Sequence, residues 1–285
     1  MYNMDVTISI VSYNTAPELA KCIKSIYSYT KDIGFEVIVI DNASTDGTIE
    51  MLQEKFPQVN IIRNKKNNFY SRANNQALKI AKGRYFLILN ADTYFKTNAI
   101  KKLIAYMDGN AYVGACEGLE LFENGKLIPN GSQDVTPLID FYELSLIGKR
   151  YKNKKLVRAF RYASQRRDKD FEIEVGCDAF LLVRTSLLKK IKGYDENLKL
   201  YYTENDLCLR VRKEGYKVMH KGDAYIYHKV SVSANKLKWR KLDLYYDDML
   251  CYYHKNGYAI GGSLLFILLK AEKLLLRLFR PNMFG

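Results

Sequence analysis

The feature that most constrains the fold is an alternation of strand-like and helix-like segments along the N-terminal third of the chain. Short runs of apolar, mostly β-branched residues alternate there with segments of helical spacing. Continuous apolar runs are typical of parallel strands that are covered on both faces. The strands are predicted at 7–12, 36–40, 60–63 and 85–89, and the helices at 17–30, 48–56 and 73–81. The pattern predicts a doubly wound α/β sheet, in which ligands bind where the strands end.

The size and composition of the chain fit a globular protein with a substantial core. It has 285 residues, of which 48% are hydrophobic and 27% charged, and a chain of this length buries most of its apolar side chains. Its five cysteines are odd in number and widely scattered, which is typical of a reducing compartment. Because Met1 to Asp5 lack the basic start of a signal peptide, we expect a cytoplasmic protein.

The C-terminal segment differs from the rest of the chain, so we expect one composite domain over 1–235 and a helical appendage over 236–285. The stretch 259–269 has eleven uncharged residues, too few to cross a bilayer. The basic residues that follow are spaced to share one stripe of a helix: Lys270, Lys273, Arg277 and Arg280. This pattern predicts a basic amphipathic helix at a membrane interface. A terminal helix packed on its own domain, or an oligomer contact, is the alternative.

The formal net charge of +14 predicts an anionic partner. Ten lysines and arginines but a single acid, Asp168, lie between Lys149 and Lys169. This basic segment is predicted to contact lipid phosphates at the inner face of the cell membrane, to cover a substrate, or to be a solvated loop. A nucleic-acid-binding protein is the rival class. We expect no nucleic acid, because no binding motif is recognisable and the acidic clusters described next would have no role.

Four polar clusters lie at or near the ends of predicted strands. They are Ser12-Tyr13-Asn14, Asp41-Asn42-Ala43-Ser44, Asn90-Ala91-Asp92 and the segment 201–210. A carboxylate at a strand end, such as Asp41, can accept hydrogen bonds from a base or a ribose hydroxyl. Asp92 leaves a buried strand, so it either binds a hard divalent cation or belongs to an ordinary turn. Glu204 and Asp206 precede a helix predicted over 207–214, where they serve either the helix dipole or general-base catalysis.

Taken together, these clusters resemble the family 2 glycosyltransferases of GT-A fold, from Thr7 to about Ser233. The resemblance rests on the order and spacing of T-I-S-I-V-S-Y-N (7–14), V-I-V-I-D-N-A-S-T-D-G-T (37–48), A-N-N-Q-A (73–77), L-I-L-N-A-D (87–92), G-Y-D-E-N-L (193–198), T-E-N-D-L-C-L-R (203–210) and H-K-V-S-V-S (228–233). The set is most similar to rhamnosyltransferase-like members that build surface polysaccharides. It implies a GT-A fold with a mostly parallel central sheet and helices on both faces, to which the C-terminal amphipathic helical appendage is added.

The resemblance also implies a donor site, residue by residue. Tyr13, Asn14 and Asp41 would hold the nucleoside, Asn75 would lie near the donor, and Asp92 would bind magnesium or manganese. Asn90 replaces the first acid of the family's D-x-D-like motif. The full donor-binding set is Ser12, Tyr13, Asn14, Asp41, Asn75, Asn90, Ala91, Asp92 and Arg210.

The catalytic residues follow from the same resemblance. Glu204 falls on the position of the catalytic base, with Asp206 as the alternative and Arg210 supporting the acidic pair. His228 falls on the position of a family histidine that approaches the metal or the diphosphate. As a neutral imidazole it would complete the coordination shell of the metal. The alternative is a structural histidine at the end of a strand. Asp178 lies in a region that, by resemblance, faces the acceptor.

The sequence departs from the family pattern at two places. Many relatives read N-x-G-F where this chain has Asn67-Asn68-Phe69-Tyr70, so a glycine beside the donor is absent. Thr203 stands in place of the first acid of an E-D-x-D motif, and Glu204 is longer than the usual aspartate.

We expect an inverting, metal-dependent transfer of a sugar, rhamnose from dTDP-rhamnose, to a glycan or lipid-linked acceptor. A UDP-sugar is the alternative donor.

Overall fold

The computed structural model describes residues 4–230 and 239–279 of the chain. The predicted strands and helices of the N-terminal third are confirmed, with ends that differ by a few residues. They are β1 (Met4–Ser12), α1 (Ala16–Tyr29), β2 (Phe35–Asp41), α2 (Thr48–Lys55), β3 (Asn60–Arg63), α3 (Phe69–Ile80) and β4 (Gly83–Asn90). Pro17 lies in the first turn of α1, where a helix loses nothing by a missing N–H group.

The strands form one mixed sheet in the order β3-β2-β1-β4-β9-β6-β10-β5. The first four strands are parallel. Beyond them, β9 (Phe180–Arg184) is antiparallel to β4 and to β6 (Val113–Leu121), whereas β10 (Lys217–His228) is parallel to β6. Short strands pair with β10 and β6, namely β5 (Thr93–Tyr94), β7 (Leu127–Ile128) and β8 (Phe171–Ile173). The parallel order predicted from the sequence therefore holds for the N-terminal half.

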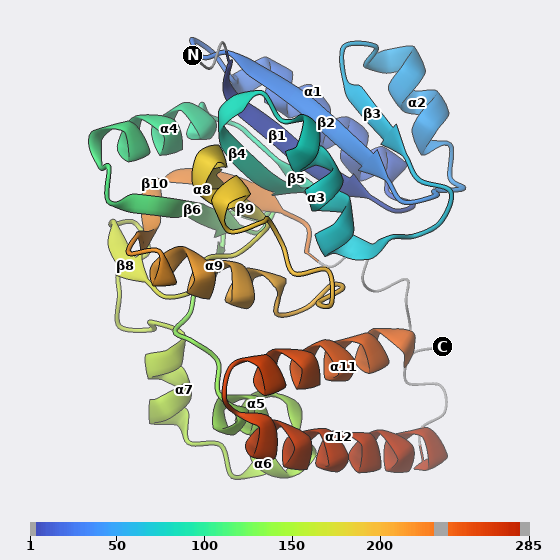
Figure 1. Ribbon diagram of the computed structural model, residues 1–285, viewed down its shortest axis with the longest axis vertical. Helices are drawn as coiled ribbons and strands as arrows, with labels where there is room; N and C mark the ends of the chain where they lie inside the picture. The colour runs from blue at the N-terminus through green and yellow to red at the C-terminus, as the bar shows by residue number, and fades with distance from the viewer. Residues whose placement is uncertain (1–3, 231–238, 280–285) are drawn as a thin grey trace.

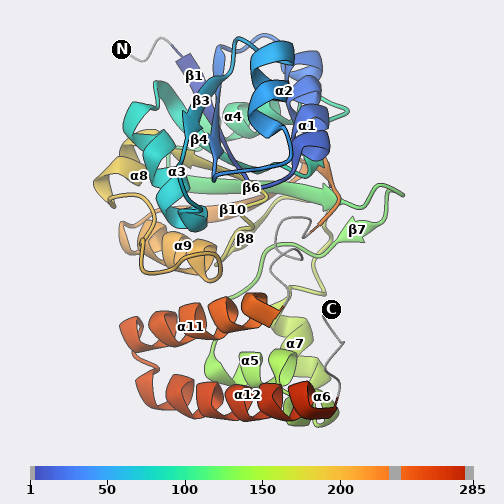
Figure 2. The ribbon, with the colours of Figure 1, turned by 90° about the vertical axis from the view of Figure 1, so that its right-hand side faces the viewer.

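Helices cover both faces of this sheet (Figure 2). One core packs α1, α2 and α4 (Ala99–Gly109) on the sheet. The other packs α3, α8 (Thr185–Lys190) and α9 (Thr203–Lys213) on the opposite face. Side chains alternate along β2, so that Val37 and Val39 enter the first core while Ile38 and Ile40 enter the second. Burial on both faces explains why β2 reads as a continuous apolar run.

A third layer of helices lies beside the sheet (Figures 1 and 2). It comprises α5 (Pro137–Leu144), α6 (Leu146–Arg150), α7 (Lys154–Phe160), α11 (Trp239–Lys255) and α12 (Ala259–Phe279). Met249, Tyr253 and Leu269 form its core with Leu198 and Tyr202, which precede α9. The layer thus combines two chain segments, 137–160 and 239–279. The domain boundary predicted at 235 and 236 lies outside the described residues and stays a prediction.

The C-terminal helix α12 presents a different face from the one predicted. Lys273 is buried and pairs with Asp243 of α11, and Lys270 lies 3.2 Å from the same carboxylate. Lys270 and Lys273 of the basic stripe therefore face α11, where Asp243 neutralises them. Arg277 is exposed, and Arg280 lies outside the described residues. The exposed stripe of α12 is apolar and consists of Ile260, Leu264, Ile267, Leu274, Leu275, Leu278 and Phe279. Within the described ranges, we find no helix whose length and apolar character would let it span a membrane.

Candidate functional site

A cavity of about 340 Å³ lies where β1 and β4 end and β9 begins. Its wall combines residues that are far apart in the sequence. They are Val11, Tyr13, Asn42, Asn67, Phe69, Tyr70, Asn90, Ala91, Asp92, Cys177, Asp178, Ala179, Leu200, Tyr201, Thr203, Glu204, His228 and Val230. Five of the predicted site residues besides Ala91 are among them: Tyr13, Asn90, Asp92, Glu204 and His228. The strand ends therefore converge on one site, as the doubly wound pattern predicts.

Two carboxyl groups of this cavity share one hydroxyl. The Thr203 Oγ1 atom lies 3.2 Å from Oδ2 of Asp178 and 3.0 Å from Oε2 of Glu204. A hydroxyl has a single proton to donate, so both contacts are hydrogen bonds only when one of the two carboxyl groups is itself protonated. Thr203, which replaces an acid of the family motif, thus links the two remaining acids.

Different surroundings act on the pKa values of the two acids. Burial and the charge of Glu204 raise the pKa of Asp178 well above its usual range. Burial also raises the pKa of Glu204, although the Thr203 hydroxyl and the charge of Arg161 lower it again in part. The positive charge of Arg161 acts on Glu204, so Glu204 is the member of the pair whose ionised form is favoured. An ionised Glu204 is the form that can accept a proton from a substrate.

A second group of titratable side chains lies across the cavity. Nε2 of His228 lies 3.2 Å from Oδ1 of Asp92, and its Nδ1 lies 2.6 Å from Oε2 of Glu120. Burial lowers the pKa of His228, but the hydrogen bonds and charges of Asp92 and Glu120 outweigh this effect and raise it to about 10. The imidazole is thus a cation between two acids at neutral pH. A metal ion would bind Nε2 only after this proton has left, because a coordinated imidazole is neutral. The neutral His228 that the resemblance implies therefore stays a prediction.

The same residues suit a magnesium or manganese ion. Asp92 offers a carboxylate oxygen and His228 a ring nitrogen on one stretch of the cavity wall. Residues 4–230 and 239–279 contain no group of three or more His, Cys, Asp or Glu side chains arranged to hold a metal. The remaining ligands of a bound ion would therefore be diphosphate oxygens and water, the mode of binding that magnesium favours at phosphate sites.

The end of the cavity where the resemblance predicts the nucleoside is built by the loops after β1 and β2. Asn42 donates from Nδ2 to the Phe69 carbonyl (3.0 Å) and so holds the 67–69 loop against the cavity. Asp41 is buried beside it, with Oδ2 accepting from the Ser44 N–H at 3.1 Å. Its other oxygen has no hydrogen-bond partner in the described part of the chain. An unpartnered buried carboxylate oxygen is costly, and a ligand hydroxyl or base N–H would satisfy it.

Two further residues of the predicted donor-binding set, Ser12 and Asn14, support the loops without lining the cavity. The Ser12 hydroxyl lies 3.0 Å from that of Thr15 and is fully buried. Asn14 adopts a left-handed conformation with φ 53° and accepts from the Thr45 N–H at 2.7 Å. The Ser12 side chain thereby joins the end of β1 to the start of α1. The Asn14 side chain joins the loop after β1 to the loop after β2.

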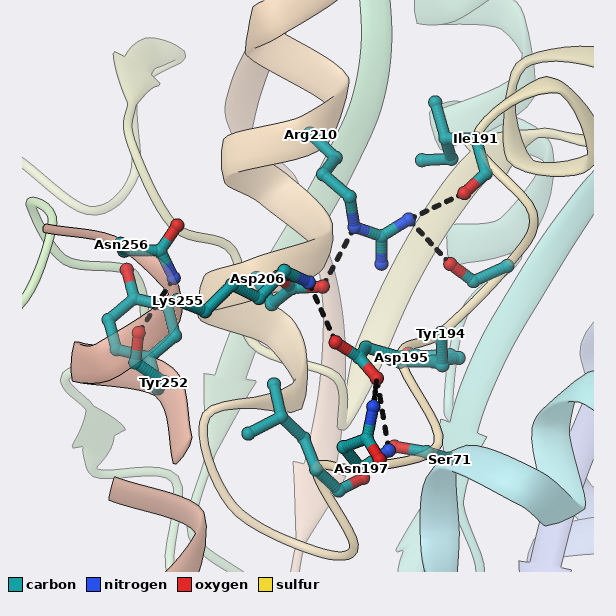
Figure 3. Close-up of polar contacts among 12 residues, drawn as sticks. Ser71, Ile191, Tyr194, Asp195, Asn197, Asp206, Arg210, Tyr252, Lys255 and Asn256 are labelled. Carbon is teal, nitrogen blue, oxygen red and sulfur yellow. Dashed lines mark hydrogen bonds and ion pairs between the residues drawn. The ribbon is translucent and has the colours of Figure 1, made fainter. Parts of the chain in front are cut away.

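Three other predicted residues lie outside the cavity. Asn75 accepts from the Tyr194 N–H (2.8 Å) and donates to the Tyr194 carbonyl (2.9 Å), so its amide anchors the loop after α8. Asp206 does not line the cavity, and it pairs with Arg210 and Lys255 (Figure 3). Arg210 also donates to the carbonyls of Ile191 and Gly193. Both Glu204 and Asp206 belong to the first turn of α9, which begins before the predicted residue 207.

The structure adds three residues to the site. From the sequence alone, these residues had no assigned role or were not recognised. Asp178 shares the Thr203 hydroxyl with Glu204, Glu120 holds His228, and Asn42 positions the Phe69 loop. Asn42 was within a recognised cluster, and Asp178 lay in a region that faces the acceptor by resemblance. Glu120 carried no signal, because an acid inside an apolar strand shows its partner only after β6 and β10 have paired.

The comparisons with known proteins place this site in a family. The model of glycosyl transferase family 2 matches residues 7–192, which include Asp41, Asp92 and Asp178. The chain therefore belongs to glycosyl transferase family 2. The sheet and the helices on its faces are those of the GT-A fold.

Individual relatives share part of the chain. An uncharacterized glycosyltransferase of Methanocaldococcus jannaschii is 26% identical over 219 residues, which are 74% of this chain and 66% of that protein. The UDP-Glc:alpha-D-GlcNAc-diphosphoundecaprenol beta-1,3-glucosyltransferase WfaP of Escherichia coli is 36% identical over 105 residues, which are 36% of this chain and 41% of that protein. Each match spans less than two thirds of the relative's length.

A solved structure supports the fold. The mannosyltransferase PcManGT from Pyrobaculum calidifontis, in complex with GDP-Man and Mn²⁺, superposes with a TM-score of 0.60 at 16% identity. The superposition covers 98% of this chain and 76% of that one. At this identity the likeness concerns the fold.

Proposed function

We propose that the protein is an inverting, metal-dependent glycosyltransferase that moves a sugar from a nucleotide diphosphate to a glycan acceptor. The observation that carries this proposal is the placement of Glu204 and Asp92 on the wall of one cavity. The first is an acid that can act as a base, and the second is a carboxylate suited to a cation beside a diphosphate. Membership of glycosyl transferase family 2 gives the reaction class.

The proposed reaction is a single displacement. An acceptor hydroxyl oxygen attacks the anomeric carbon from the face opposite the diphosphate, and the bond from that carbon to the diphosphate oxygen breaks. Glu204 takes the proton of the attacking hydroxyl, and the nucleoside diphosphate leaves with the bonding electron pair. General-base assistance of this kind contributes a rate factor of about 10²–10⁴. The proton held by Asp178 leaves Glu204 as the ionised member of the pair.

Asp92 and His228 would hold the metal ion in this proposal. When bound, a magnesium or manganese ion neutralises the negative charge that develops on the departing diphosphate. Glu120 fixes the imidazole ring of His228 through its 2.6 Å contact with Nδ1, which is the common supporting role of a carboxylate behind a metal-binding histidine. Asp41 and Asn42 would orient the nucleoside at the other end of the cavity.

Two donors follow from different observations. The motif resemblance leads us to propose rhamnose from dTDP-rhamnose. The name of the Escherichia coli relative specifies UDP-Glc as its donor, which favours a UDP-sugar as the second candidate. That name also includes a diphosphoundecaprenol acceptor, in keeping with a lipid-linked acceptor in surface polysaccharide synthesis.

A thermal-shift panel tests the function and the donor together. dTDP, UDP and GDP, and their sugars, are added with and without manganese, because a ligand that binds the native state raises its stability by mass action. We expect one nucleotide to raise the melting temperature and manganese to increase the effect. Asp92→Asn should remove the manganese-dependent part, whereas Asp32→Asn, an exposed acid outside the cavity, should keep it. A panel without any nucleotide-dependent shift would contradict the proposal.

We also propose that the apolar stripe of α12 lies on the inner face of the cell membrane. Ile260 and Leu264 on this stripe are 80% and 65% exposed, and Leu146 and Ile147 of α6 are also exposed. The basic segment begins at Lys149, two residues after Ile147. Apolar side chains beside cations are the combination that binds an anionic membrane surface.

Liposome sedimentation tests the membrane proposal. We expect the protein to sediment with vesicles that contain anionic lipid, and Leu264→Ser with Ile267→Ser to release it. Ile80→Ser is the matched control, because Ile80 is an exposed isoleucine at the end of α3. Equal sedimentation of the double variant and the control would contradict a role of α12.

A further inference from the structure

A second cavity lies beside the candidate active site, and Glu204 lines both. It has a volume of about 260 Å³ and extends from Glu204 into the helical layer. Tyr201 and Tyr245 line it, with ring centroids 4.6 Å apart. Aromatic side chains with hydroxyl groups offer both an apolar face and a hydrogen-bonding group, which suits a sugar ring next to the base.

A third and larger cavity, of about 940 Å³, lies among α5, α7 and the loop after α7. Its wall carries five cations and two acids. The cations are Lys152, Arg158, Arg161, Arg166 and Arg167, and the acids are Glu143 and Asp168. The cavity therefore has an excess of positive charge, which attracts an anionic ligand.

The second and third cavities adjoin each other. Glu143 and Arg161 line both of them and form an ion pair of 3.2 Å. Arg161 is also near enough to Glu204 for its charge to counteract part of the rise in pKa that burial causes. A ligand that extends from the basic cavity past Arg161 therefore reaches Glu204.

The cations of the basic cavity differ in their availability. Lys152 and Arg161 share Glu143, and Arg166 pairs with Asp168. Arg167 is buried and donates to the carbonyls of Asn130 and Arg161. Arg158, in the last turn of α7, has no acidic partner among residues 4–230 and 239–279. Its guanidinium is thus free to bind a ligand.

We propose that the basic cavity binds the phosphate or diphosphate group of the acceptor, while the acceptor sugar lies in the tyrosine-lined cavity against Glu204. This inference rests on the proposed glycosyltransferase function and adds an acceptor of defined chemistry to it. Guanidinium groups bind phosphate oxygens in pairs of charge-assisted hydrogen bonds. Arg158 supplies the unpaired charge, and Arg161 joins the phosphate group to the reacting end.

Calorimetry with farnesyl diphosphate tests the proposal without requiring the natural acceptor. A saturating nucleoside diphosphate, the one chosen by the thermal-shift panel, fills the donor cavity first, so that the probe is measured at the second site. We expect Arg158→Ala to weaken the binding of the probe about tenfold or more, because one charged hydrogen-bonding partner is lost. Lys155→Ala is the matched control, because Lys155 is an exposed cation of the same helix that does not line the cavity.

The outcomes separate this inference from the proposed function. Equal binding of farnesyl diphosphate by Arg158→Ala and Lys155→Ala, with nucleotide binding intact, would overturn the inference alone. If the unaltered protein binds none of the nucleotides, the result counts instead against the proposed function. Two further probes, glycerol phosphate and farnesol, identify what the site recognises. If glycerol phosphate binds as tightly as farnesyl diphosphate, the anion comes from a phosphate-bearing polymer. If glycerol phosphate binds more weakly, the anion comes from a lipid diphosphate. Farnesol bound as tightly as farnesyl diphosphate would show that the phosphate group is not recognised and would overturn the inference.

Discussion

Lys255 of α11 forms an ion pair of 2.6 Å with Asp206 of α9, and this contact joins the helical layer to the helix that carries Glu204. The Asp206 side chain is almost fully buried, and it pairs with Arg210 on its other oxygen (Figure 3). A carboxylate held by two cations is fixed in position. Asp206 is therefore suited to holding two layers together, and of these two acids of α9 Glu204 is the one that lines the cavity.

Replacement of Asp206 separates the structural role from the catalytic one. We expect Asp206→Asn to lower the free energy of unfolding by about 1–3 kcal/mol, because Arg210 and Lys255 lose a charged partner but both retain contact with solvent. Turnover per folded molecule should stay within a few-fold of the unaltered enzyme. Urea unfolding and single-turnover assays measure the two quantities. A loss of turnover as large as that of Glu204→Gln would return Asp206 to the role of the base.

The Asp178 and Glu204 pair gives a second prediction. If Asp178 carries the proton, Asp178→Asn keeps an uncharged, hydrogen-bonding side chain beside Thr203, so turnover should fall only a few-fold. Glu204→Gln removes the proton acceptor and should lower kcat by a factor of about 10²–10⁴, with donor binding retained. The comparison of the two amide variants at one pH is the measurement. Equal losses would show that both carboxyl groups take part in proton transfer.

The site could be predicted from the sequence where it depends on strand ends. The apolar runs before Tyr13 and Asp92 identify buried parallel strands, and parallel strands bring their carboxyl ends to one edge. That geometry brings Tyr13 and Asp92 to the cavity. Asn75 lies on a helix instead, where a motif match says nothing of which face is used, and its amide bonds Tyr194.

The helical layer shows what the sequence could not supply. The spacing of Lys270 and Lys273 correctly indicated a stripe on a helix, but the direction of that stripe depends on Asp243, which lies on a different helix. The protonation of Asp178 likewise depends on Glu204 and on burial, which arise only when distant segments pack. Local periodicity defines elements, whereas long-range contacts decide which face of an element is buried.

Phe69 offers a third prediction, which concerns the glycine that the family motif contains and this chain lacks. Phe69 adopts a left-handed conformation with φ 60° and lines the cavity. A side chain in this region costs about 1–2 kcal/mol, and glycine avoids the cost. We therefore expect Phe69→Gly to be more stable than Phe69→Ala by about 1 kcal/mol, after the greater flexibility of glycine in the unfolded chain is included. Both variants lose the same ring from the cavity, so a comparison of their urea unfolding midpoints isolates the backbone effect. A more stable alanine variant would exclude backbone strain at this position.

Asp140 gives a prediction for the dependence of stability on pH. This buried carboxylate accepts hydrogen bonds from the hydroxyl groups of Tyr202 and Tyr253. Burial raises its pKa from 3.8 to about 6, and the two tyrosine hydroxyls only partly oppose the rise. Because the folded protein holds this proton more tightly than the unfolded chain, the stability that Asp140 contributes is full below pH 4 and is lost as the pH rises to 6.

The size of this effect follows from the two pKa values, since their difference corresponds to about 3 kcal/mol. Asp140→Asn replaces the carboxyl group by a side chain of similar shape that does not ionise. At pH 4 the variant and the unaltered protein should unfold with nearly the same free energy, whereas at pH 7 the variant should be more stable by up to about 3 kcal/mol. Urea unfolding at a series of pH values measures the difference directly. If the free energy of unfolding of the variant differs from that of the unaltered protein by the same amount at pH 4 and at pH 7, Asp140 has the same pKa in the folded and unfolded chains. The Tyr202 and Tyr253 hydroxyls then compensate fully for its burial.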